Sequence, residues 1–464
     1  MKNKGSVTIF LCLMVTAMVL LGLTATKAVG YSLAEAKGAI AVRSAMSSVD
    51  AGYNSYIFEN YHILLFDKSC NGKGEAYLEE QLIADVEHNL GYGFMVDELG
   101  VNDYDLLLED DCSAFRKQIS DYCSYALIED GASSVLEATG NQDGTVSQEI
   151  YSDMDSATTE EPDDFFISLG DDEEDDPRDF TENLTSEGIL AIVAPEDLTI
   201  SSEIVELYGV PSIEKIEYDF FDYQVDNDFD DLDMLKKDVD EYDSWKDKLL
   251  GGGAALVYAT KVFNYATENV QENTAFAFEL EYIICGRASD MENLKGTVNR
   301  IIGVRFPVNY AYLVSDASKM AEIKKLSWPI ALATLVPEPI VRYLIAGCWA
   351  YVESIFDTRC LLDGQKQAFF KNKSNWKTDL NDLENSVNLD GEEAETGLEY
   401  KDYLMILMAM DMEKTYYRML DVIELNTKRR YPSFDMSNAA VGFTLDTKIT
   451  YKDRSICYRE QMGY

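Results

Sequence analysis

The feature that most constrains this chain is an uncharged stretch close to its start. No residue from Ser6 to Thr26 carries a charge, and about 20 mostly apolar residues suffice for a helix to cross the hydrocarbon core of a bilayer. Lys2 and Lys4 precede the stretch, and short cationic flanks stay on the cytoplasmic side. The sequence therefore predicts a single-pass protein of the cell membrane, with a cytoplasmic tail at 1–5, a transmembrane helix at 6–26 and an extracellular remainder.

A cleavable secretory signal is the alternative interpretation of this stretch. Such signals have an apolar core of about 7–15 residues, followed by a small-x-small cleavage site. The stretch here is longer, and Thr26-Lys27-Ala28 fits that site poorly. We therefore expect the segment to be retained.

The helical pattern continues beyond the apolar stretch. Small and apolar residues recur, with charged residues between them, at Val29, Leu33, Ala36, Ile40 and Val49. This spacing is typical of one face of a helix, so one long helix is predicted to leave the membrane. The face could serve an assembly or pack only against the protein's own domain, and periodicity does not separate these two hypotheses.

Net charge excludes one class of partner. The formal charge is −45, from 84 acidic and 39 basic residues, whereas nucleic-acid binding needs clustered cations. Such a surface attracts cations or basic partners instead. The acids are densest between Tyr151 and Glu182, where Arg178 is the one basic residue, and this composition predicts a solvated, poorly ordered segment over 141–185.

The remaining patterns predict an α+β fold, because helices and strands occur without a sustained β-α-β alternation. Helices are expected over 75–90, from Phe115, from Pro339 and from Tyr400, and as a pair divided near Pro307. Strand patterns lie at 61–67, 189–195, 276–285 and 439–451. The predicted division is a long helix with a first exterior lobe over 27–140, the acidic segment 141–185, and an α+β exterior domain over 186–464.

A second membrane span over 330–352 is a weaker hypothesis than a buried core helix. Glu338, Arg342 and the two prolines beside Glu338 interrupt the stretch, and charges at membrane depth are costly. The methionines that follow Tyr400 are likewise expected to pack in a core.

No enzyme motif is present. The chain has two histidines, His62 and His88, and neither a G-x-S-x-G nor an H-E-x-x-H sequence. His62 lies in an apolar run and is expected to be structural. The eight cysteines lack metal-ligand spacing, and free buried thiols are favoured over one or two disulfides. The sequence predicts no catalytic residue and no cofactor.

One acidic patch offers weak metal-ligand candidates, Asp226, Asp228 and Asp230, at alternate positions. A calcium-binding loop of the helix-loop-helix type needs glycine at its sixth position and glutamate at its twelfth. Asp231 and Lys237 stand there, so a solvated acidic turn is the preferred interpretation.

Two sets of segments carry a family resemblance. The opening GSVTIFLCLMVTAMVLLGLTATKAVGYSLAEAKGAIAVRSAMSSVDA resembles the start of TadE/TadG-like proteins, the minor pseudopilins of tight-adherence (Tad) pilus systems. The rest resembles a Gram-positive family of unknown function found with such pilus genes. The segments that carry this second resemblance are YHILLFD (61–67), FELEYIICGRASDMENL (278–294), RFPVNYAYLVSD (305–316), WAYVESIFDTRCLLDGQK (349–366), YKDYLMILM (400–408) and YYRMLDVIELN (416–426).

The resemblance implies a membrane-anchored, pseudopilin-like protein that assists the assembly, priming or tip formation of a pilus. Its partners would be membrane lipid through residues 6–26 and other pilus-assembly proteins. Prepilin processing would fall between Gly5 and Ser6, and the fifth residue of the processed chain would then be Phe10. Major pilins place a glutamate at that position, so a minor component is implied rather than a repeating subunit. The alternatives are an acidic surface module that binds cations or a cationic partner, and an unrecognised envelope enzyme.

Overall fold

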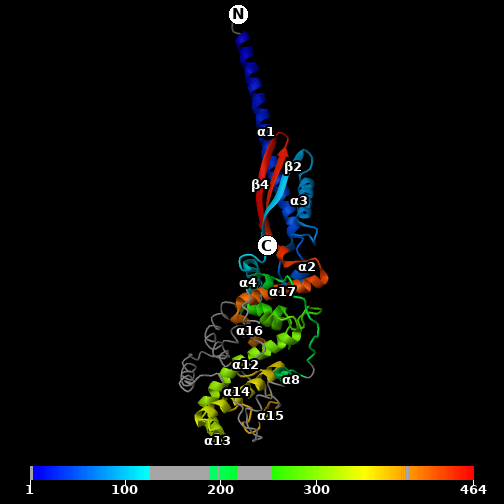
Figure 1. The fold of residues 1–464 in the computed structure, drawn as a ribbon. Coiled ribbons are helices and arrows are strands. Elements are labelled where there is room, and N and C mark those ends of the chain that lie inside the picture. Colours follow the sequence, from blue (N-terminus) through cyan, green and yellow to red (C-terminus); the bar gives the residue numbers. More distant parts are fainter. Residues whose placement is uncertain are drawn as a thin grey trace. The chain divides into compact units, whose positions relative to one another are not determined.

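The protein has an α+β fold in two compact units, which we describe separately. The structure is a computed structural model that describes residues 4–125, 188–195, 198–216 and 253–464, apart from residues 388, 390, 392–393 and 395–396. Unit 1 comprises the described residues up to 118 together with 427–464, and unit 2 comprises those of 119–426. The boundaries fall within helices α4 (Ser113–Tyr125) and α17 (Met412–Arg430) (Figure 1).

Helix α1 (Lys4–Asp50) confirms the prediction of one long helix from the apolar stretch onward. At 1.5 Å per residue its length is about 70 Å, more than twice the hydrocarbon thickness of a bilayer. Its first half is exposed among the described residues: Met14 is 52% exposed and Leu21 is 70% exposed. It is the one helix among the described residues that is long and apolar enough to span a membrane.

The second half of α1 is built into unit 1 through a face of mostly small residues. The buried members of this face are Ala34, Gly38, Ala41, Val42, Ala45 and Met46. A side chain at Gly38 would collide with the ring of Tyr458, whose hydroxyl donates a hydrogen bond to the carbonyl of Glu35 at 3.0 Å. The glycine therefore allows the helix and the sheet to approach closely.

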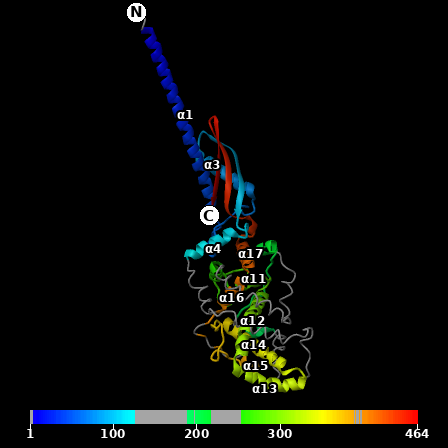
Figure 2. The ribbon, with the colours of Figure 1, turned by 90° about the vertical axis from the view of Figure 1, so that its left-hand side faces the viewer.

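The sheet of unit 1 is antiparallel and is organised around the C-terminal strand β3 (Ala439–Tyr451). Strand β2 (Phe94–Leu106) follows one edge of β3 from Phe94 opposite Tyr451 to Leu106 opposite Ala440. On the other edge, β1 (Phe66–Asp67) pairs with the start of β3, and β4 (Arg454–Gly463) pairs with its remainder. Helix α3 (Glu75–Leu90) contacts α1 and β2 (Figure 2) and contributes Leu78, Leu82, Val86 and Leu90 to the core.

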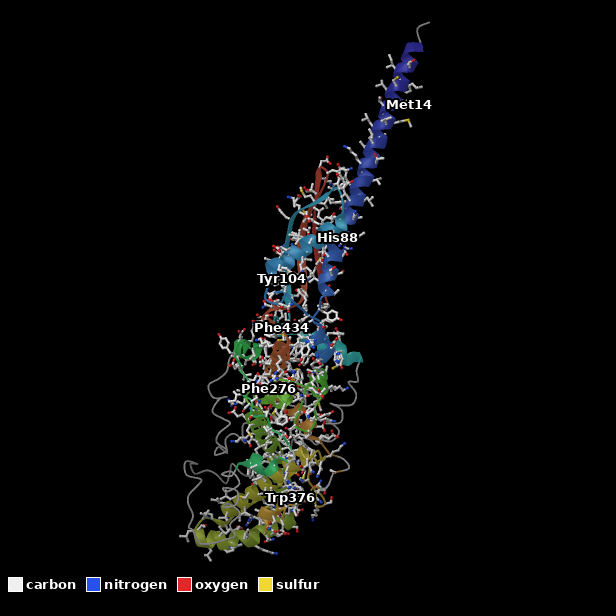
Figure 3. The ribbon with its side chains drawn as sticks, turned by 90° about the vertical axis from the view of Figure 1, so that its right-hand side faces the viewer. Met14, His88, Tyr104, Phe276, Trp376 and Phe434 are labelled. Carbon is white, nitrogen blue, oxygen red and sulfur yellow. The ribbon has the colours of Figure 1, made fainter. Side chains whose placement is uncertain are left out.

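Unit 2 is helical in its described part, and Phe276 and Trp376 (Figure 3) are among its buried aromatic side chains. Helices α12, α13 and α14 pack against one another, and α11 packs against α12 and α16. The bounds are α8 (Ile189–Val193), α9 (Pro211–Lys215), residues 253–262, α11 (Glu279–Cys285), α12 (Asp290–Ser315), α13 (Ala317–Thr334), α14 (Glu338–Leu362), α15 (Leu383–Ser386) and α16 (Tyr400–Met410).

Two predicted strands are wrong, and a third is confirmed only at its last two residues. At 61–67, helix α2 (Ser55–Tyr61) ends at His62, which has a left-handed φ of 57°, and strand pairing begins only at Phe66. The runs at 189–195 and 276–285 contain the short helices α8 and α11. The run 276–285 is buried at nearly every position, so it shows neither alternation nor a one-sided helical stripe. The run 189–195 is only seven residues long, and short apolar runs of this kind are ambiguous between helix and strand.

Two predicted helix boundaries also need correction. Helix α12 continues through Pro307, although proline removes a hydrogen bond and crowds the carbonyl four residues earlier. Buried residues on both sides of the proline, Ile302 and Asn309 among them, hold the helix together. Conversely, the helix predicted from Tyr400 is divided, because Asp411 ends α16 and its carboxylate accepts a hydrogen bond from the backbone of Lys414 in α17.

The other predicted elements are confirmed. Helices α3, α4 and α14 and strand β3 occur at the predicted positions. Helix α14 is buried over much of its length, and Met405, Met408 and Met419 lie in the core. The compact units differ from the predicted division, since 427–464 groups with the N-terminal residues. The reason is that β3 pairs with strands more than 300 residues away in sequence.

Candidate functional site

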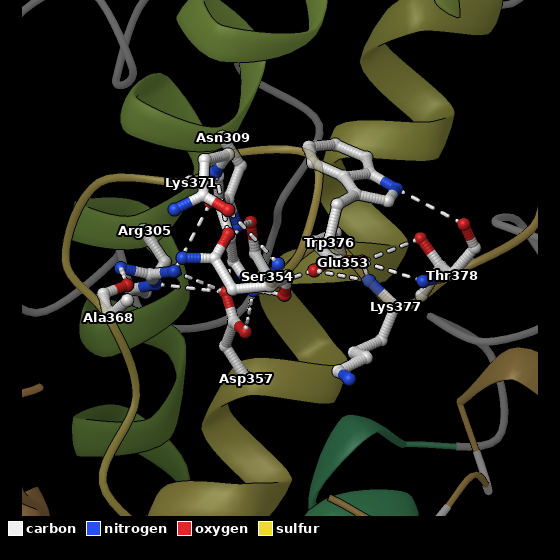
Figure 4. A network of polar contacts seen from close by, with 12 residues as sticks. Arg305, Asn309, Glu353, Ser354, Asp357, Ala368, Lys371, Trp376, Lys377 and Thr378 are labelled. Atoms are coloured by element: carbon white, nitrogen blue, oxygen red, sulfur yellow. Dashed lines mark hydrogen bonds and ion pairs between the residues drawn. The ribbon is translucent and has the colours of Figure 1, made fainter. Parts of the chain in front are cut away.

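The most elaborate polar arrangement in the described residues is a buried ionic network in unit 2 (Figure 4). Helix α12 supplies Arg305, helix α14 supplies Glu353 and Asp357, and the segment after α14 supplies Lys371. The side chains of all four are at most 1% exposed. Buried charges are normally paired, and each of these four has at least one partner of opposite charge.

Arg305 is the centre of one half of the network. Its guanidinium donates to the Asp357 carboxylate, with an Nε–Oδ2 distance of 3.0 Å, and to the carbonyls of Ala368 and Phe369 at 3.0 and 2.7 Å. Asn309, one turn along α12, bridges the helices by donating to Asp357 at 3.0 Å. The arginine thus fixes the segment after α14 against both helices.

Lys371 and Glu353 form the other half. The Lys371 ammonium donates to Glu353 and to Asp357, both at 2.6 Å. The second oxygen of Glu353 accepts hydrogen bonds from the backbone and the hydroxyl of Thr378, at 2.9 and 2.7 Å. Both carboxylates are therefore fully engaged within the protein.

The electrostatic balance of the network suits a structural role. Two cations face two carboxylates, so the buried group has no net charge. Burial alone would raise the pKa of Asp357, but the Arg305 guanidinium and the Lys371 ammonium outweigh it and hold that pKa below its usual range. A carboxylate that stays ionised and is fully hydrogen-bonded is a poor proton carrier. The arrangement can lock helices together but offers little for acid–base chemistry.

A second buried polar cluster lies around α11. Glu279 accepts hydrogen bonds from the backbone of Asn264 at 2.8 Å and from the amide of Asn426 at 2.6 Å. Glu281 accepts them from the backbone of Ala266 at 2.9 Å and from the hydroxyl of Tyr400 at 2.8 Å. In contrast to the ionic network, the groups that donate these hydrogen bonds to the two carboxyl groups are neutral. Burial raises the pKa of Glu279 to about 8 and that of Glu281 to about 7.

These raised pKa values predict that the protein loses stability as the pH rises. In the unfolded chain Glu279 releases its proton near pH 4.5, whereas in the folded protein it does so near pH 8. The folded state therefore binds more protons across this window, and the free energy of unfolding falls as the pH rises through it. Urea unfolding at pH 5, 6, 7 and 8 should show this decline, and Glu279→Gln should reduce its slope. The exposed Glu272→Gln is the matched control, and equal slopes in the two variants would contradict the assignment.

The site residues predicted from sequence lie elsewhere. Gly5 and Ser6 are in the first turn of α1, while Asp226, Asp228 and Asp230, like the acidic segment 141–185, fall outside the described residues. Within the described part of the chain, no three His, Cys, Asp or Glu side chains are grouped so as to hold a metal ion.

The two histidines lie at helix ends, and the cysteines are partly buried and partly exposed. His62 is exposed at the end of α2, and His88 lies in the last turn of α3. All eight cysteines are free thiols in this structure, and four of them, Cys112, Cys123, Cys285 and Cys360, are buried.

Sequence reasoning missed the ionic network. The one available signal is the pair Glu353 and Asp357, four residues apart in a stretch that carries no other charge between Arg342 and Arg359, because two acids on a buried face require cationic partners. Nothing in the sequence identifies those partners, since Arg305 lies 52 residues from Asp357.

Comparison with known proteins yields one match. A family of unknown function, DUF5702, has a model that matches residues 168–451, a range that includes both polar clusters. No curated protein and no solved structure matches the chain.

Proposed function

The chain belongs to the family of unknown function DUF5702, whose description assigns no activity, and from its architecture we propose that it is a membrane-anchored, pseudopilin-like structural protein. It assists the assembly or function of a Tad-type pilus, with its N-terminus in the cytoplasm and its bulk outside the cell. It acts by association and not by catalysis.

The observation that carries the proposal is the exposed face of α1 beyond the apolar stretch. Val29, Leu33 and Ile40 are 68%, 69% and 68% exposed, and Ala36 between them is also exposed. Together the four form the α1 ridge. Their spacing of four, three and four residues is that of a seam between packed helices. The opposite face of α1 is already buried in unit 1, so the ridge is available to a partner.

The membrane favours association through this ridge. Helices anchored in one bilayer with the same orientation are already parallel, and confinement raises their effective concentration. A partner helix would remove three large apolar side chains from water, which stabilises the complex at roughly 25 cal/mol per Å² of buried apolar surface. The resemblance of residues 5–51 to TadE/TadG-like pseudopilins supports a pilus component as the partner.

Cysteine crosslinking in native membranes tests the proposal. In a background where the exposed Cys12 and Cys457 are replaced by serine, Leu33→Cys and Ile40→Cys should give crosslinked species with a short bismaleimide. Mass spectrometry then identifies the partner as a second copy or another pilus protein.

The matched control is Glu35→Cys, which is exposed on α1 but lies off the ridge and should crosslink at least several-fold less. If all three positions give only monomer, or crosslink equally, α1 does not associate through the ridge.

A further inference from the structure

We propose that Trp349, Trp376 and Tyr312 form a binding site for a quaternary ammonium group, and that Lys319 of the same chain occupies this site as a built-in competitor. We refer to the three aromatic residues as the aromatic cage. The cage goes beyond the proposed role in assembly and does not depend on it.

The geometry of the cage is that of a cation site. The Lys319 ammonium nitrogen lies 4.1 Å from the ring centroid of Trp349 and 4.4 Å from that of Trp376. The two indoles are nearly perpendicular, at 85°, with centroids 5.5 Å apart, and the ring of Tyr312 lies 5.6 Å from that of Trp376. A cation between these rings meets the negative faces of two tryptophans, the strongest aromatic partners for a positive charge.

The cage is rigid because both of its indole N–H groups are held by hydrogen bonds to one residue, Thr378. Trp349 donates a hydrogen bond to the hydroxyl of Thr378 at 2.9 Å, and Trp376 donates to the carbonyl of the same residue at 3.1 Å. The Thr378 hydroxyl donates in turn to Glu353 at 2.7 Å. The ionic network therefore holds the cage in place. Because the rings are already ordered, a ligand would bind with little loss of side-chain entropy.

Lys319 matches the cage imperfectly. A primary ammonium has three N–H donors, whereas ring faces offer no conventional acceptor. In the described part of the chain no carboxylate lies within 4.0 Å of its Nζ. Burial lowers the pKa of Lys319, although Glu353, Glu322, Asp316 and Asp379 oppose this. The nearby carboxylates attract a positive charge, but burial outweighs them and disfavours a primary ammonium whose N–H groups have only ring faces beside them.

A quaternary ammonium matches those surroundings better. It carries a permanent charge, has no N–H group to satisfy, and is recognised in proteins by aromatic cages of this kind. Lys319 is only partly buried, in the first turn of α13, so its flexible side chain can leave toward solvent and open the ring faces. The ligand chemistry is that of a choline headgroup or a trimethylated lysine.

Calorimetric titration of the full chain in detergent tests the inference. Choline should bind saturably, whereas 3,3-dimethyl-1-butanol, its neutral isostere, should not. Lys319→Met should tighten choline binding by about tenfold, because a competitor that fills the cage for roughly nine-tenths of the time weakens apparent affinity in that proportion. Trp376→Phe should weaken binding through the smaller ring while keeping an aromatic face.

The control variant is Lys324→Met, on the exposed surface of the same helix, which should leave choline affinity unchanged. Parallel titrations with phosphatidylcholine vesicles and with a trimethyllysine peptide distinguish a lipid source from a protein source, and saturable binding of either supports the site. The inference is overturned if the unmodified chain binds neither choline nor these probes. It is equally overturned if the neutral isostere binds as well as choline, or if Lys319→Met leaves the affinity unchanged.

Discussion

Replacing Arg305 with methionine should lower the free energy of unfolding of unit 2 by about 3–5 kcal/mol, the usual cost of removing one partner from a buried ion pair. The side chains of Arg305 and Asp357 are both 0% exposed, so water cannot replace the lost guanidinium. The variant also leaves the carbonyls of Ala368 and Phe369 without their donor. Chemical denaturation followed by tryptophan fluorescence measures the loss, because Trp349 and Trp376 belong to the same unit.

Two variants show whether burial of the charge causes this loss. Arg342 pairs with Glu338 on the partly exposed surface of α14, and Arg342→Met should cost less than about 1 kcal/mol. In Arg305→Met two carboxylates share one cation, Lys371. Adding Asp357→Asn removes the excess negative charge and should restore part of the stability, since Lys371 still pairs with Glu353. A loss in Arg305→Met no larger than that in Arg342→Met would show that the network is not a major source of stability.

Deleting residues 6–26 should move the protein from the membrane fraction to the soluble fraction. These residues form the apolar, exposed half of α1, and a helix of about 20 apolar residues anchors a protein almost irreversibly. Alkaline carbonate extraction is the measurement: the complete chain should stay in the pellet and the shortened chain should enter the supernatant.

The paired variant Leu33→Ser/Ile40→Ser separates anchorage from assembly. Both residues lie beyond the apolar stretch, so this variant should remain in the carbonate pellet while losing the crosslinks of the α1 ridge. Release of the complete chain by carbonate would contradict the transmembrane assignment.

The elements that sequence predicted well share a long, regular pattern. Helix α1, helix α3 and strand β3 are each more than ten residues long. Over such a length the spacing of apolar residues distinguishes a helix from a strand. The strand predicted over the residues of α11 was wrong because the tertiary fold buries this segment on all sides. Even its two glutamates are 0% exposed. Periodicity also located the stripe Val29, Leu33, Ala36 and Ile40, but it could not show that α1 packs on its own unit through the opposite face.

The two polar clusters could not be predicted from the sequence, for a different reason. Arg305 meets Asp357, and Glu279 meets Asn426, across 52 and 147 residues of sequence. No local spacing encodes such a contact, which depends on how helices dock. The same holds for the aromatic cage, whose residues come from α12, α14 and the segment that follows α14.

The central claim is that α1 remains part of the mature protein as its membrane anchor, and intact mass with N-terminal sequencing of the native membrane protein tests it most directly. The account predicts a chain that retains residues 6–26, starting at Met1 if it is unprocessed or at Ser6 if a prepilin peptidase has acted. A chain that starts near residue 28 would contradict it, because the apolar stretch would then be a signal removed from a released protein.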